Sequence, residues 1–199
     1  MFLAASSASI CSVIGTAVVV AVRKSRGFFK KTLEGLSLLP EMLPSIVLVI
    51  GLMLFWNWAY KVLPIYNTIW IMVLAYVILY LRYTVQYVTS ALTQINDNLL
   101  QAGRVFGGTP SYVFRRVTLP MISRGIFAGW MMIFIIAFRE LVTASLIAPP
   151  NTLVVSTYIN REFEQGSVSS GCAMAVMCVL VTTTVLLVCS RLAGKRKGT

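Results

Sequence analysis

Oxygen-bearing side chains gather near residue 160, in and just before the polar run NREFEQG. Tyr158, Glu162 and Glu164 supply phenol and carboxylate oxygens, the ligands that a hard cation such as Ca²⁺ prefers. One interpretation is therefore a cation site on this part of the chain. An ordinary solvated loop explains the same residues, and we favour that interpretation.

Other covalent or metal chemistry has little material in this chain. The sequence contains no histidine, and its six Asp and Glu residues are scattered over 199 positions. It also lacks the G-x-x-x-x-G-K-[ST] loop that holds ATP phosphates. These absences argue against histidine-based proteases, zinc enzymes and a P-loop ATPase. We expect no catalytic residue, no cofactor and no metal site.

A second polar segment, QAGRVFGGTPSYVFRRVTLP at residues 101–120, is suited to meet a partner in water. An Asn-Asp pair at 96–97 can cap a short helix by accepting a free backbone N–H. Gly107 suits the positive φ at the end of that helix. Thr109 followed by Pro110 is typical of the start of a second helix. The segment is therefore predicted to be a helix–turn–helix.

Long apolar runs flank this segment and must position it. The chain is 58% hydrophobic and only 12% charged, whereas a soluble domain carries roughly a quarter charged residues. A membrane-spanning helix needs about 20 mostly apolar residues. The runs of suitable length are 4–22, 42–60, 62–81, 119–138 and 165–190. We predict an all-α fold, a polytopic membrane bundle of five transmembrane helices.

Small residues recur at helical spacing in two of these runs. Ser7, Cys11 and Gly15 follow one another every four residues, and Gly125 and Gly129 form a G-x-x-x-G pair. Small faces let transmembrane helices approach closely. We therefore expect the first and fourth spans to pack tightly against neighbouring helices.

The Lys and Arg residues are concentrated on one side of the predicted bundle. With five spans, the basic loop 23–31, the segment 82–124 and the tail from Arg191 share a side and carry five, five and four of them. The three on the other side are Lys61, Arg139 and Arg161. Because cytoplasmic loops carry an excess of Lys and Arg, we place the N-terminus outside and the C-terminus in the cytoplasm.

The start of the chain resembles neither a leader nor the beginning of a complete bundle. No basic residue precedes Arg23, so the positive region of a signal peptide is missing. We expect a membrane domain over 1–192 that lacks preceding helices, followed by a basic cytoplasmic tail at 193–199. Within this domain, Pro40 and Pro44 are expected to open the second span, and 149–168 is expected to form an outer loop.

The spacing within 101–120 resembles the EAA loop of binding-protein-dependent ABC importer permeases, whose pattern is E-A-A-x3-G-x9-I-x-L-P. The chain differs at the first position, where Gln replaces Glu, at the third, where Gly replaces Ala, and at the isoleucine position, where Val stands. The residues that occupy the seven pattern positions are Gln101, Ala102, Gly103, Gly107, Val117, Leu119 and Pro120.

The resemblance extends over nearly the whole chain. Residues 39–52 are similar to the proline-marked helix entry of these permeases. Residues 63–76 and 138–147 resemble the ferric-iron type, which is commonly a double-length chain, and the similarity is to its C-terminal half. The resemblance implies the MetI-like fold of type I importers.

The resemblance also implies that separate subunits perform different steps of transport. The 96–120 loop would dock on a separate ABC ATPase subunit, with Phe106 and Tyr112 as contacts, and this chain would not itself be an enzyme. A periplasmic or extracellular solute-binding protein would deliver the solute, and a second permease bundle would complete an alternating-access path. The implied location is the bacterial cytoplasmic (inner) membrane, with no nucleic-acid partner.

Substrate and class stay open at this point. Ferric iron is expected by resemblance, and phosphonate, polyamine or thiamine are alternatives. A membrane-embedded enzyme and a scaffold without a path are the other classes, but neither explains the spacing of Gly107, Leu119 and Pro120. Arg115 and Arg116 are explained by the general excess of cytoplasmic charge.

Arg139 and Glu140 fall near the outer membrane boundary, about 28 Å along a helix from Pro120. Ionisable groups near membrane depth usually meet partners or water. One interpretation places this pair at the outer gate of the translocation path. The other, which we favour, is a pair of interfacial anchors.

Overall fold

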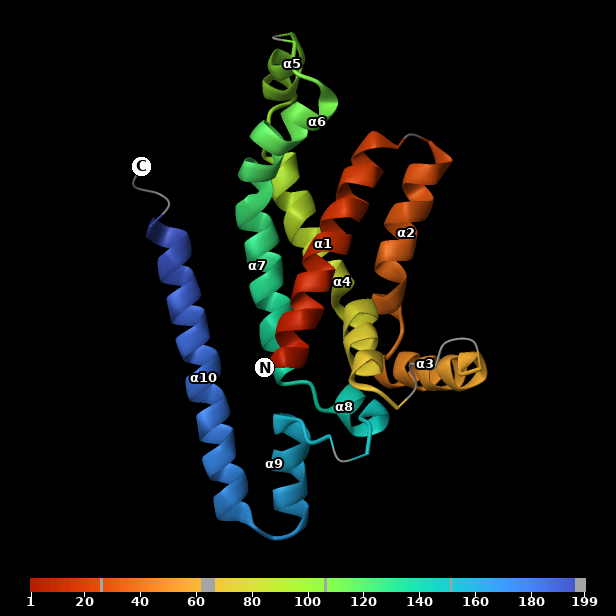
Figure 1. Ribbon diagram of the computed structural model, residues 1–199, viewed down its shortest axis with the longest axis vertical. Helices are drawn as coiled ribbons and strands as arrows, with labels where there is room; N and C mark the ends of the chain where they lie inside the picture. Colours follow the sequence, from red (N-terminus) through yellow and green to blue (C-terminus); the bar gives the residue numbers. More distant parts are fainter. Residues whose placement is uncertain (26, 62–66, 106, 151, 196–199) are drawn as a thin grey trace. The chain divides into compact units, whose positions relative to one another are not determined.

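The computed structural model describes residues 1–25, 27–61, 67–105, 107–150 and 152–195 (Figure 1). Every regular element in these ranges is a helix, so the predicted all-α fold is confirmed there. Within these described ranges, four helical segments are long and apolar enough to cross a membrane. They are Phe2–Lys24 (α1), Ile69–Thr93 (α4), Pro110–Phe138, which ends in α7 (Leu119–Phe138), and Val168–Arg191 within α10 (Val168–Lys195).

The remaining predicted span, 42–60, corresponds to a shorter helix. This helix, α3, covers Ser45–Ala59 and has 15 residues. At its helical rise it is about 22 Å long, less than the ~30 Å thickness of the hydrocarbon core. The count of five transmembrane helices therefore stays a prediction.

The segment before α3 differs from the loop expected at 23–31. Gly27 has a φ of 64°, and a separate helix, α2, runs from Phe28 to Met42 with Pro40 inside its last turn. Pro44 lies at the N-cap of α3. Because a residue before proline is disfavoured in the helical region, Pro44 explains why α2 stops before Leu43. Of these two prolines, only Pro44 lies at the start of a helix, so the prediction for Pro40 was wrong.

The chain divides into two compact units, which we describe separately. One consists of Ala8–Met42 and Val77–Ile133, and so contains α2, the predicted helix–turn–helix, and most of α1, α4 and α7. We call it the coupling unit. Its buried core brings together side chains from α1, α4 and α7, with Ile95 just beyond α4, and consists of Val19, Val88, Leu92, Ile95 and Ile122.

Close helix contacts in the coupling unit occur at the predicted small residues. A Cβ added at Gly15 would lie 2.7 Å from Thr84 Cγ2 on α4. At Gly125 it would lie 2.6 Å from Ala91 Cβ and 2.8 Å from the Tyr87 carbonyl oxygen. All three distances are shorter than a real Cβ tolerates. The expected tight packing of the first and fourth spans is therefore confirmed.

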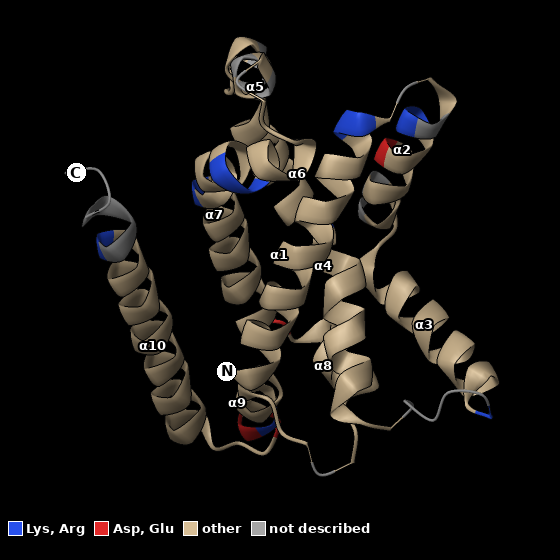
Figure 2. Ribbon diagram, turned by 45° about the horizontal axis from the view of Figure 1, so that its top comes forward, with Lys and Arg blue, Asp and Glu red and all other residues tan. Residues whose placement is uncertain are grey.

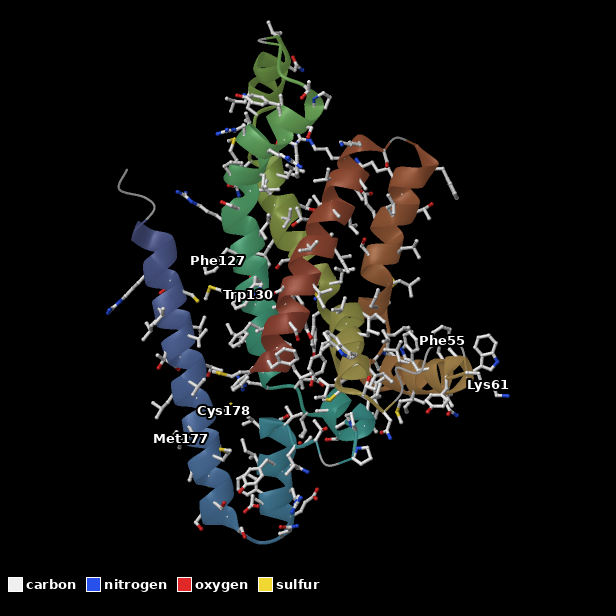
Figure 3. The ribbon with its side chains drawn as sticks, viewed as in Figure 1. Phe55, Lys61, Phe127, Trp130, Met177 and Cys178 are labelled. Atoms are coloured by element: carbon white, nitrogen blue, oxygen red, sulfur yellow. The ribbon has the colours of Figure 1, made fainter. Side chains whose placement is uncertain are left out.

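Aromatic residues add a further link between α1 and α7 in this unit. The Trp130 indole N–H donates a hydrogen bond to Ser9 Oγ at 3.1 Å. The Trp130 ring stacks on Phe127 one turn earlier, with centroids 6.4 Å apart (Figure 3). A buried or half-buried indole N–H normally finds such a partner.

The other unit comprises Met1–Ser7, Leu43–Tyr76 and the described residues from Phe134 onward. In it, the short helix α8 (Val142–Ile147) contacts α3, and α9 (Val155–Glu164) packs against α10. Gly166, with a φ of 81°, turns the chain between α9 and α10. Gly171 then lets α10 approach the Phe163 ring. The predicted outer loop 149–168 is thus helical over α9, which corrects that expectation.

Candidate functional site

The first helix of the predicted helix–turn–helix is α5, Asp97–Val105. Its start is capped by Asn96, whose Oδ1 accepts a hydrogen bond from the Asn98 backbone N–H at 3.0 Å. Such a cap satisfies one of the free amides in the first turn. The helix therefore begins at the Asn-Asp pair that the sequence pointed to, with Asn96 as the cap.

The turn after α5 depends on its glycines. Gly107 has a φ of 79°, in the left-handed region that favours glycine. The Gly108 N–H donates a 3.1 Å hydrogen bond to the Gly103 carbonyl, closing the end of the helix as in a Schellman motif. A Cβ at Gly107 would meet nothing within 4 Å. The requirement at this position is therefore the backbone conformation rather than space.

The second helix, α6, covers Pro110–Val113. Thr109 is its N-cap, since Thr109 Oγ1 accepts from the Tyr112 N–H at 3.3 Å, and Pro110 occupies the first helical position. Val113 is buried, and a Cβ added at Gly103 would lie 3.2 Å from Val113 Cγ2. Gly103, where the family pattern has alanine, therefore allows close contact between α5 and α6.

A π-helical turn, η1 (Phe114–Thr118), joins α6 directly to α7. The Leu119 N–H reaches back to the Phe114 carbonyl, one residue further than in an α-helix. Pro120 follows, and a proline has no N–H and clashes with the carbonyl four residues earlier. The wide turn accommodates that proline. This turn was not predicted from the sequence, although Pro120 indicates an irregularity just before it.

Apolar and aromatic side chains are exposed around the turn, and one of them, Tyr112, is a predicted contact residue. Tyr112 is 59% exposed and Val105 is 83% exposed, although both are apolar or aromatic. Phe106 lies outside the described residues, as does the side chain of Ala102, a position within α5. The other predicted positions are exposed at Gln101, Gly107, Leu119 and Pro120 and partly exposed at Gly103 and Val117. We call the described residues 96–120 the coupling segment.

Basic side chains lie at the same end of the coupling unit as this segment. Arg115 and Arg116 are exposed on η1, while Arg23 and Lys24 form the last turn of α1 (Figure 2). Phe114 and Lys24 line one common groove, which brings the two basic pairs to one end of the unit.

Arg139 and Glu140, in the other unit, occupy the corner after α7. Glu140 Oε1 accepts hydrogen bonds from the Thr143 N–H at 3.0 Å and from Thr143 Oγ1 at 3.1 Å. The Glu140 carbonyl also accepts from Ser156 Oγ on α9. A carboxylate at a helix N-terminus is favourable for hydrogen bonding and for the helix dipole. Glu140 therefore holds the start of α8 and links it to α9.

The oxygen-rich residues near 160 lie on α9 rather than in a loop. The Glu164 carboxylate accepts a 2.8 Å hydrogen bond from Asn160 Nδ2, one turn earlier on the same helix. Tyr158 and Glu162 belong to the same helix. Among the described residues, no group of three potential metal ligands comes together.

The sequence matches a family model described as "Binding-protein-dependent transport system inner membrane component" over residues 13–197. The chain belongs to this family. It is therefore a multi-pass permease of the ABC importer type rather than an enzyme.

Curated relatives of this permease differ in what they carry. It is 24% identical over 197 residues to the putative 2-aminoethylphosphonate transport system permease protein PhnV of Salmonella typhimurium, covering 99% of this chain and 72% of that protein. It is 24% identical to the spermidine/putrescine transport system permease protein PotC of Escherichia coli, covering 98% and 72%. An Fe(3+)-transport system permease protein of Haemophilus influenzae is 25% identical, covering 89% of this chain and 35% of that protein.

Solved structures share the fold of this permease. A chain of the MetNI methionine ABC transporter, in an inward-facing conformation, matches with a TM-score of 0.76 over 96% of this chain and 91% of that one, at 16% identity. A chain of a bacterial ABC transporter that imports the polysaccharide alginate matches with a TM-score of 0.71, covering 98% and 79% at 15% identity.

Proposed function

We propose that this permease forms half of an alternating-access path and couples to a separate ATPase through the coupling segment. The observation that carries the proposal is the glycine turn at Gly107, which joins two capped helices and leaves Val105 and Tyr112 exposed beside it. Exposed apolar side chains on an otherwise polar segment are typical of a protein–protein contact.

Force on this segment has a direct route into the membrane. The helix is continuous from Pro110 to Phe138, so a displacement of α6 moves the start of α7. Within the coupling unit, α7 packs closely on α4 at Gly125 and on Thr84 at Gly129. A rigid helix with such contacts shifts as a body, and nucleotide binding at a distant site can then bias two packing arrangements.

The proposal also specifies the orientation of the permease in the membrane and its partner subunits. The basic end of the coupling unit faces the cytoplasm in the proposal, with the N-terminus outside and the C-terminus inside, because Lys and Arg accumulate on cytoplasmic segments. Five helices would span the bacterial inner membrane, α3 among them. A second permease bundle, either a twin chain or a fused half, and an external solute-binding protein complete the importer.

The transported solute is proposed to be ferric iron, as the sequence analysis expected. Aminophosphonates and polyamines are the competing solutes, since curated relatives are described as carrying them. The test is reconstitution of the permease with its ATPase and binding protein in liposomes, followed by ATP-dependent uptake of ⁵⁵Fe(III), labelled 2-aminoethylphosphonate and labelled spermidine. Iron uptake would support the proposal, uptake of another solute would replace iron, and no uptake with any binding protein would favour a scaffold.

Glu140 offers a separate test of the outer gate, which remains a proposal for Arg139 and Glu140. In Glu140→Gln the side-chain oxygen can still accept from Thr143, but the negative charge is lost. If the charge acts in the gate, uptake falls by roughly fivefold or more while the amount of protein in the membrane is unchanged. The measurement is initial uptake rate normalised to abundance.

Glu140→Ala is the matched comparison, because it removes the cap together with the charge. Loss of a helix cap costs about 1 kcal/mol, so this variant is expected to melt at a lower temperature. Normal uptake by Glu140→Gln combined with a destabilised Glu140→Ala would leave Glu140 as a structural cap and remove the gate.

A further inference from the structure

A groove with a volume of about 610 Å³ lies on the coupling unit, between α1 and the start of α7. One wall is the face of α1 that runs from Ser12 to Lys24 at helical spacing. The other wall consists of Phe114, Leu119 and Ile126. The described members of both walls belong to this single unit.

The two hydroxyl-bearing residues in the α1 wall already have hydrogen-bond partners. Ser12 Oγ donates to the Ala8 carbonyl at 2.8 Å, and Thr16 Oγ1 donates to the Ser12 carbonyl at 2.6 Å. These hydroxyls bond back into their own helix, so they offer no donor to a polar ligand. The remaining lining is aliphatic or aromatic up to Lys24. The groove is therefore apolar along its length and cationic at one end.

Its length corresponds to one leaflet of a bilayer. From Ser12 to Lys24 the helix rises by roughly 18 Å, while half of a ~30 Å hydrocarbon core is about 15 Å. Further positive charge lies near the Lys24 end of the groove, because Arg115 and Arg116 follow Phe114 on η1 and are exposed. An occupant that fits must be apolar over about one leaflet and negatively charged at its head.

We propose that this groove binds one anionic phospholipid, with an acyl chain along α1 and the headgroup phosphate at Lys24. Basic pockets between membrane helices on the cytoplasmic side recognise lipids of this kind. The bound lipid would touch Phe114 and Leu119, where the coupling segment enters the membrane.

The test is native mass spectrometry of the full permease in its purified complex, first delipidated in detergent and then titrated with phosphatidylglycerol or phosphatidylcholine. We expect one phosphatidylglycerol per permease chain to remain bound where phosphatidylcholine dissociates. Ala17→Phe fills the groove without changing charge and should abolish that binding. Ile14→Phe, which places the same phenylalanine side chain at an exposed α1 position outside the lining, should leave it intact.

A second pair of variants tests the headgroup contact. Lys24→Gln is expected to weaken phosphatidylglycerol binding about fivefold, the effect of one basic residue near anionic lipid. Lys31→Gln removes an exposed basic residue from α2 that does not line the groove and should change little. Equal retention of the two lipids, or equal loss in both variants of either pair, would overturn the proposal. Finding a second chain of this permease bound in the groove, instead of lipid, would also overturn the proposal. Because lipid retention does not require transport, either result would leave the proposed function standing.

Discussion

Gly107→Val is expected to abolish co-purification of the permease with its ATPase while leaving its abundance in the membrane nearly unchanged. A β-branched residue in the left-handed region costs roughly 1–2 kcal/mol or more, and Gly107 sits there with a φ of 79°. The chain avoids that cost by opening the turn, which separates α5 from α6 and disperses the exposed docking surface. Because a Cβ at this position meets nothing within 4 Å, the spans themselves should still fold.

Gly107→Asn is the matched control for this experiment. Asparagine tolerates the left-handed conformation much better than valine, so this variant should retain most of the bound ATPase. The measurement is the ratio of ATPase to permease after affinity purification in detergent. Full ATPase retention by Gly107→Val would contradict the role of the turn, and equal loss in both variants would point to side-chain bulk instead of backbone conformation.

Gly125→Leu is expected to prevent accumulation of a folded, monodisperse permease. A Cβ at this position would already lie 2.8 Å from the Tyr87 carbonyl oxygen, which belongs to the α4 backbone and cannot rotate away. Gly125→Ala should show a graded version of the effect, because overpacking of this kind costs about 1–3 kcal/mol. The measurement is the amount of monodisperse protein and its midpoint of thermal unfolding in detergent.

Gly51→Ala is the control for that prediction. Gly51 is also a glycine within an apolar helix, α3, but a Cβ there would enter open space. Alanine has the higher helix propensity by about 1 kcal/mol, so this variant should unfold at the same or a higher temperature. A Gly125→Leu protein that is as abundant and as stable as the original would refute the close α4–α7 contact.

Local chemistry in the sequence predicted the coupling segment well. Asn96, Gly107 and Thr109 each act through their own backbone neighbours, so their residue types indicate a cap, a turn and a second cap. The G-x-x-x-G pair at Gly125 and Gly129 likewise carries its meaning in its spacing. These features need no knowledge of distant parts of the chain.

Other features depend on contacts that the sequence does not display. The π turn lies where Pro120 follows a helix that continues from α6 into α7, and the proline by itself does not indicate that the helix continues. The helix α9 contains a charged run that reads as a loop, yet it forms against α10 with Phe163 beside Gly171. The groove beside Lys24 joins residues about a hundred positions apart, so no local pattern indicates it.

Photo-crosslinking from Tyr112 tests the central claim most directly. A benzoylphenylalanine placed at this exposed position of α6 should, on illumination of cells that contain the whole importer, form an adduct with the P-loop ATPase subunit, and Gly107→Val should remove that adduct. An adduct formed only with periplasmic or extracellular proteins, or only with other helices of the permease itself, would contradict the account.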